Sequence, residues 1–221
     1  MAGEPSEVNN SGPFVFYTER RLVLLTGLKA GNLRQLTEHL HSVSGSSIFY
    51  HTHHQYLSQH FEKPLFHNDF AKWTARALLE DRLAERLAAI DLLAFTSIRQ
   101  LREAIIAVIE EHLAGSTQPP RDARADDEFH FCESQSFLMP TGIVANDVGE
   151  FFENIRGVSN VSLFCHFFEA RLRLERATND FSLWLRGLGE EELARKIERL
   201  DPYAMTLDEL RDEIVRAGGT R

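Results

Sequence analysis

The chain has 221 residues, of which 43% are hydrophobic and 26% are charged, and its formal net charge is −9. These values are typical of globular proteins, and the length allows a sizeable buried core. Nonspecific binding to nucleic acid or to an anionic membrane needs clustered Lys and Arg, which a net negative charge disfavours. We therefore expect neither nucleic acid nor a membrane among the partners.

The cysteines and the chain start indicate a compartment. Cys132 and Cys165 lie in apolar surroundings at no metal or redox spacing, so they are expected to be small buried side chains without a disulfide. The first residues lack the basic and apolar segments of a signal peptide, and no apolar run reaches the length of a membrane span. These features predict a cytoplasmic protein.

In chain order, the first feature is a polar tail at residues 1–13, predicted to be disordered. A shift of 115 residues then aligns Phe14–Leu57 with Phe129–Leu172 without a gap, and 12 of these 44 positions are identical. The match resumes where Asn68-Asp69-Phe70 faces Asn179-Asp180-Phe181. This self-similarity predicts two repeats, residues 14–114 and 129–217, joined by a polar linker at 115–128. We expect the repeats to pack as one globular unit, related by a pseudo-twofold axis.

Each repeat is predicted to contain a short β-hairpin followed by four or five helices. β-favouring residues flank a polar turn at 14–25 and again at 129–139, and a Thr-Gly pair follows whose glycine is expected at φ > 0. Capping residues place the first helix after Asn32 and Asp147, and the second is predicted near Ser47 and Ser162. The third is predicted at the Asn-Asp pairs, and the last two at 82–91 and 97–113, and at 190–200 and 206–217. The fold class is therefore mainly α with a small β component, in which the two hairpins could join into one sheet.

Few polar residues are shared by the two repeats, and a shared pair is expected to do one physical job in both. The pairs are Thr26/Thr141, His51/His166, Asn68/Asn179, Asp69/Asp180 and Arg102/Arg211. Helix capping accounts for the Asn-Asp pairs, and a turn accounts for Thr-Gly. Asn68, Asp69, Asn179 and Asp180 are nevertheless candidate binding residues because both repeats retain them.

His51 and His166 allow two interpretations. As a structural residue, each imidazole would bond Asp69 or Asp180 on the next helix and lock two helices together. As functional residues, the two would converge at the interface of the repeats, where a divalent Zn, Fe or Mn ion could bind. The ligands of that metal site would be His51, His54, His166 and Glu169, with Asp69 and Asp180 orienting the imidazoles. The structural interpretation is favoured because nothing in the sequence brings the two helices face to face.

A basic cluster in the second repeat is the last candidate site. This region is locally positive because it contains Arg171, Arg173, Arg176 and Arg186. It is either a solvated face balanced by nearby Glu or a contact for an anion or acidic partner. Arg173 shares a predicted helical stripe with His166 and Glu169, which makes it a candidate binding residue. The sequence motifs of phosphate-binding loops, dinucleotide sites, serine hydrolases and zinc proteases are absent, so no catalytic residue is identified.

Several strings resemble a known family. A family of bacterial proteins catalogued only as a domain of unknown function is similar to this chain at Ser162–Leu174, Asn179–Leu185 and Leu200–Tyr203. The other half of that family resembles residues 49–54 and 67–73. The resemblance covers most of the chain from residue 14, implies a bacterial source, and brings no activity or cofactor. The sequence therefore predicts a non-catalytic binding or regulatory module, serving a neighbouring enzyme or binding a small anionic ligand. The alternative is a metal-binding protein or metal-dependent enzyme.

Overall fold

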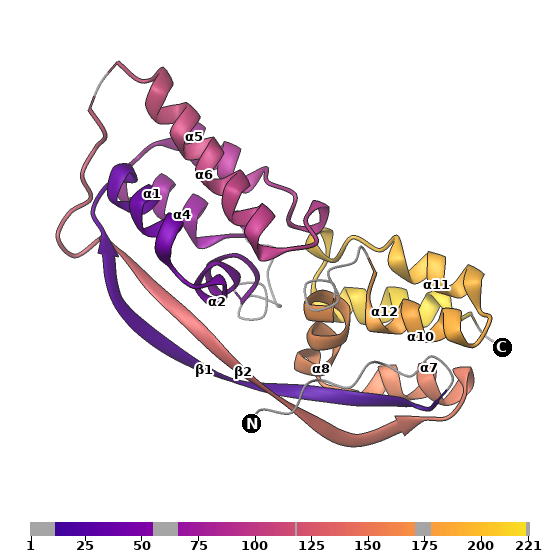
Figure 1. Ribbon diagram of the computed structural model, residues 1–221. Coiled ribbons are helices and arrows are strands. Elements are labelled where there is room, and N and C mark those ends of the chain that lie inside the picture. Colours follow the sequence, from indigo (N-terminus) through magenta and orange to yellow (C-terminus); the bar gives the residue numbers. More distant parts are fainter. Residues whose placement is uncertain (1–11, 55–65, 118, 171–177, 220–221) are drawn as a thin grey trace. The chain divides into compact units, whose positions relative to one another are not determined.

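A computed structural model of the chain describes residues 12–54, 66–117, 119–170 and 178–219 (Figure 1). The described residues are mainly helical and include one small antiparallel sheet of two strands, β1 and β2. The predicted fold class, mainly α with a small β component, is confirmed at this level. None of the helices in these ranges is long and apolar enough to cross a bilayer.

The order of elements in the first part of the chain recurs in the second. The first part comprises β1 (Phe14–Ala30), α1 (Leu33–Ser42), α2 (Gly45–Phe49), the π-helical turn η1 (Tyr50–His54), α4 (Asp69–Ala77), α5 (Asp81–Ala88), the 3₁₀ turn η2 (Leu92–Ala94) and α6 (Ile98–Gly115). The second comprises β2 (Phe129–Ala145), α7 (Val148–Gly157), α8 (Asn160–Phe164), the π-helical turn η3 (Cys165–Glu169), α10 (Asp180–Gly187), α11 (Glu191–Glu198), the 3₁₀ turn η4 (Pro202–Ala204) and α12 (Leu207–Ala217).

The predicted hairpins are wrong, because each part contains one continuous strand of 17 residues. β1 and β2 are hydrogen-bonded to each other, so the polar residues 18–21 continue the strand instead of reversing it. The two β segments do join in one small sheet, as expected. Gly27 and Gly142 have φ values of 79° and 80°, as predicted, but they lie inside the strands.

Helix starts follow the capping residues. As the sequence predicted, the backbone N–H three residues ahead donates a hydrogen bond to the capping side chain at Asn32, Asp147, Asn68 and Asn179. The second helix of each part begins slightly earlier than predicted. Ser44 and Ser159 are the caps, and Ser47 and Ser162 are the third helical residues, whose N–H groups those caps accept.

The chain divides into two compact units. We call Arg21–Ser136 the central unit, and Met1–Arg20 together with Phe137–Arg221 the terminal unit. These units divide the chain at other places than the expected repeats, which were separated at the linker 115–128. Each strand is shared between the units, so its first half belongs with helices from the other part of the chain.

Aromatic packing explains this exchange. In the terminal unit, the ring of Phe14 lies 5.5 Å from Phe151 of α7 and 5.6 Å from both Phe181 and Trp184 of α10. Such pairs each stabilise by about 0.5–1.5 kcal/mol beyond the burial of their area. The start of β1 is therefore part of the core that the later helices form.

The start of β2 packs in the same way in the central unit. The Phe129 ring stacks on Phe70 of α4 at 5.2 Å and meets Trp73 edge-on at 5.6 Å. Phe129 and Phe131 are both buried. Each core therefore needs a strand segment that is distant in sequence from its helices, since Phe14 is 137 residues from Phe151 and Phe129 is 59 residues from Phe70.

Candidate functional site

The two shared histidines lie in π-helical turns that extend short α-helices, His51 in η1 and His166 in η3. In η3 the backbone N–H of Ala170 reaches the carbonyl of Cys165, five residues back. This wider turn departs from the α-helical wheel on which a polar stripe was predicted. His166 is 3% exposed and its helical neighbours Phe164 and Phe168 are buried too, so the imidazole lies in the core; Arg173, the last residue of the predicted stripe, lies outside the described residues.

In the central unit, both ring nitrogens of His51 are engaged. Nδ1 lies 2.9 Å from Oδ2 of Asp69 on α4, and the backbone N–H of Cys132 on β2 donates to Nε2 at 2.9 Å. Because Nε2 accepts a hydrogen bond, the neutral ring carries its proton on Nδ1 and donates it to the carboxylate. His51 thus joins the end of η1, the start of α4 and β2.

The same arrangement recurs 115 residues along the chain, in the terminal unit. His166 Nδ1 lies 2.8 Å from Oδ2 of Asp180, and the N–H of Tyr17 on β1 donates to Nε2 at 2.8 Å. The predicted bonds to Asp69 and Asp180 are thus present. The strand partner was missed, since a backbone N–H has no sequence signal and Tyr17 and Cys132 differ in type.

Further shared polar residues hold the same strand segments. The Thr26 hydroxyl donates to the carbonyl of Phe131, and that of Thr141 to the carbonyl of Phe16, both at 2.8 Å. The Trp73 indole donates to the Asp127 carbonyl at 2.7 Å, and the Trp184 indole to that of Gly12 at 2.8 Å. Thr26 and Thr141 were assigned to a turn from sequence, yet their side chains anchor a neighbouring strand.

The arginine pair caps helix ends. Arg102 donates to the carbonyl of Val43 at 2.6 Å, and Arg211 donates to those of Ile155 and Val158, also at 2.6 Å. These carbonyls follow or end α1 and α7, where backbone acceptors lack helical partners. Arg102 and Arg211 are therefore explained by the fold.

The predicted metal ligands are distributed over both units. His51 lies in the central unit, whereas His166 and Glu169 lie in the terminal unit, and the His54 side chain is outside the described residues. Within the described ranges, no group of three or more His, Cys, Asp or Glu side chains is arranged to hold an ion. His51 and His166 could bind a metal only by giving up a hydrogen bond to the strand or to the carboxylate.

The thiol and phenol near His51 are poorly suited to nucleophilic chemistry. Burial, and secondarily the charge of Asp69, raises the pKa of Cys132. Burial also raises the pKa of Tyr50, with smaller contributions from Cys132 and Asp69. Both groups are therefore protonated at neutral pH, and Cys165 is fully buried.

A pocket of about 340 Å³ opens beside the His51–Asp69 pair within the central unit. Its polar lining comes from α4, from the residues that lead into β2 and from the start of β2 itself: Asp69, Lys72, Arg76, Asp127, Glu128 and His130. The Asp69 side chain is 17% exposed, whereas the Asp180 side chain in the terminal unit is 2% exposed. The sequence did not indicate Lys72 and Arg76, because the residues that align with them, Leu183 and Gly187, carry no charge.

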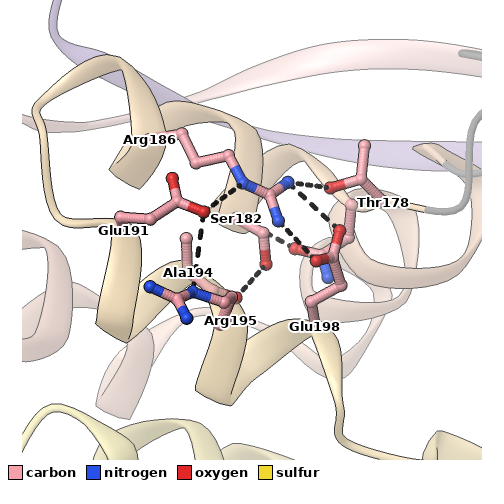
Figure 2. Close-up of polar contacts among 8 residues, drawn as sticks. Thr178, Ser182, Arg186, Glu191, Ala194, Arg195 and Glu198 are labelled. Carbon is pink, nitrogen blue, oxygen red and sulfur yellow. Dashed lines mark hydrogen bonds and ion pairs between the residues drawn. The ribbon is translucent and has the colours of Figure 1, made fainter.

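The basic cluster is described only at Arg186, since Arg171, Arg173 and Arg176 lie outside the described residues. Arg186 bonds Glu198 at 3.1 and 2.5 Å, Thr178 at 3.3 Å and Glu191 at 3.5 Å, and these contacts are the dashed lines around Arg186 in Figure 2. Arg186 therefore belongs to a balanced network between α10 and α11.

The chain belongs to a family of unknown function, DUF5752, whose model matches residues 11–218. Among solved structures it is similar to OrfY from Thermoproteus tenax, with 31% sequence identity, a TM-score of 0.81 and 93% of each chain covered. No curated protein matches the sequence significantly.

Proposed function

We propose that this protein is a non-catalytic accessory module that binds another protein through its strands, and that it arose by duplication of one unit. The observation that carries the proposal is a run of exposed apolar side chains on β1. Leu22, Val23, Leu24 and Leu25 are 52%, 42%, 39% and 77% exposed. We call Leu22–Leu25 the apolar strand segment.

The strand geometry makes this segment unusual for a surface. Successive strand residues point to opposite faces, so four exposed neighbours place apolar side chains on both faces of β1. Among the described strands, β2 is the sole hydrogen-bonded neighbour of β1, which leaves one edge open. Exposed apolar edge strands attract partners unless charges protect them, and residues 22–28 carry no charge.

The corresponding stretch of β2 shares this character within the terminal unit. Phe137, Leu138 and Met139 are 50%, 39% and 37% exposed. Their recurrence 115 residues along, together with the recurring histidine, threonine and tryptophan contacts, supports the duplication.

The partner we expect is a different protein that supplies an apolar, extended segment to the open edge. A second copy of this chain would also carry a net charge of −9, and repulsion between the two copies opposes self-association. A catalytic role finds little support, because both shared imidazoles are saturated with hydrogen bonds and the thiol near His51 is protonated. Action beside a neighbouring enzyme in the cytoplasm fits these features.

The test is complex formation with the proteins encoded next to this chain, followed by light scattering after gel filtration. Leu25→Lys places a charge in the apolar strand segment and should weaken the complex about tenfold or more. Leu79→Lys is the matched control, because Leu79 is 66% exposed in the same unit but lies outside the strands, and it should bind normally.

Two results would contradict the proposal. One is a homodimer of the isolated chain that Leu25→Lys dissociates, which would assign the segment to a second copy. The other is a complex whose affinity is equal for Leu25→Lys and Leu79→Lys.

A further inference from the structure

We propose that the pocket of the central unit binds a small molecule that carries a phosphate or carboxylate group. Its volume of about 340 Å³ lies within the range of small-ligand sites. This ligand site is independent of the apolar strand segment, because none of Leu22–Leu25 lines the pocket.

Two unpaired cations define the ligand class. Lys72 and Arg76 are four residues apart on α4, which places them on the same face of the helix, and both line the pocket. Neither side chain has a hydrogen bond or ion pair within the parts of the chain that the structure describes. Like charges at this spacing destabilise a helix, and a bound oxyanion would relieve that repulsion.

The carboxylates of the pocket do not neutralise these cations. Asp69 accepts from His51 at 2.9 Å, and Glu128 pairs with Lys29 at 3.1 Å. Asp127 is exposed and lines the pocket from the segment before β2, where it directly precedes Glu128. A ligand with an anionic group at Lys72 and Arg76, and a hydroxyl or ammonium group toward Asp127, would complement all three charges.

The terminal unit shows that the fold does not need these charges. Trp184 and its bond to Gly12 repeat Trp73 and its bond to Asp127, which fixes the correspondence between the two frameworks. At the positions of Lys72, Arg76, Asp127 and His130, the terminal unit has Leu183, Gly187, Gly12 and Val15. The same scaffold thus exists without the charged lining, so folding does not account for Lys72 and Arg76.

The two tryptophans allow a direct test with the intact protein. The chain has 2 Trp, and each indole N–H gives its own signal in a proton–nitrogen NMR spectrum. Inorganic phosphate, titrated at constant ionic strength, should shift the Trp73 signal saturably, because that indole bonds Asp127 at the pocket. The Trp184 signal, which reports the uncharged counterpart, should stay in place. Sodium acetate provides the same test for a carboxylate.

Variants at the two cations make the result specific. Lys72→Leu, which introduces the residue found at position 183, and Arg76→Gln should each lower phosphate affinity about tenfold or more. Arg99→Gln removes one exposed positive charge on α6 and should leave that affinity unchanged. Unshifted Trp signals in the free variants would show that the fold is intact. Parallel, non-saturating shifts of both indoles, or wild-type affinity in Lys72→Leu, would overturn the proposal.

Discussion

At the scale of single residues, His51 and His166 each join one carboxylate and one strand N–H. The two sites differ in exposure, since Asp180 is 2% exposed and Asp69 is 17% exposed. Removing the carboxylate leaves the Nδ1–H group of a buried imidazole without its acceptor, which costs about 1–3 kcal/mol. At Asp69, water can replace part of that loss.

We therefore predict that Asp180→Ala lowers the free energy of unfolding more than Asp69→Ala does. Both residues occupy the first position of a helix, so the loss of helix-dipole stabilisation is similar in the two variants. Urea titrations of the two variants and the wild type measure the difference. A larger loss for Asp69→Ala would contradict the assigned burial of the two pairs.

His53 provides a second prediction at this scale. Burial, with a smaller contribution from the charge of Arg21, lowers the pKa of His53 to about 3. An unfolded histidine titrates near pH 6.5, so between these pH values the unfolded chain binds one proton more than the folded chain. His53 therefore destabilises the fold progressively as the pH falls, by about 1.4 kcal/mol for each pH unit.

His53→Phe should remove this contribution. The terminal unit already has Phe168 stacked on Phe164 at 4.6 Å, where the central unit has His53 stacked on Phe49 at 5.0 Å, so a phenyl ring suits the position. The free energy of unfolding should vary less steeply between pH 6 and pH 4 than in the wild type. The control is His41→Phe, whose side chain is 59% exposed in the wild type and which should keep the wild-type dependence of unfolding free energy on pH. Equal pH dependence in the wild type and both variants would show that His53 is not the buried base.

At the scale of elements, the strands depend on glycine where the backbone is left-handed. Gly142 has φ 80° and no heavy atom within 4 Å of an added Cβ, so its requirement is conformational and not steric. Gly142→Ala should lower stability by about 1 kcal/mol. Gly157 also has no heavy atom within 4 Å of an added Cβ, but it lies at the end of α7 without a positive φ, so Gly157→Ala should be neutral or stabilising. Thermal melts of both variants measure the contrast.

The elements also show what sequence could predict. Helix starts at Asn32, Asn68, Asp147 and Asn179 were predictable because a cap and its recipient N–H are three residues apart. The strands were mistaken for hairpins because the ladder partner of β1 is far away in the sequence, where no local pattern reports it. The His–Asp bonds followed from residue type, whereas the Cys132 and Tyr17 N–H partners and the charged pocket depend on tertiary structure.

At the scale of the whole molecule, each unit needs strand residues from both parts of the chain. Phe14 packs with Phe151 and Trp184, and Phe129 packs with Phe70 and Trp73. Cutting the chain at a protease site inserted after Gly115 should therefore leave the two fragments associated. Gel filtration should show them together in buffer and apart in urea, and separation in buffer would contradict the exchange of strand halves.

The assignment of the shared histidines to strand anchoring is the claim on which the non-catalytic interpretation depends. Nitrogen-15 NMR of the imidazole rings tests it most directly, because it distinguishes a protonated ring nitrogen from one that only accepts. We predict that in both His51 and His166 the proton is on Nδ1 while Nε2 only accepts, and that Zn²⁺ leaves both signals unchanged. A proton on Nε2 of either ring, or signals that move stoichiometrically with Zn²⁺, would contradict the account.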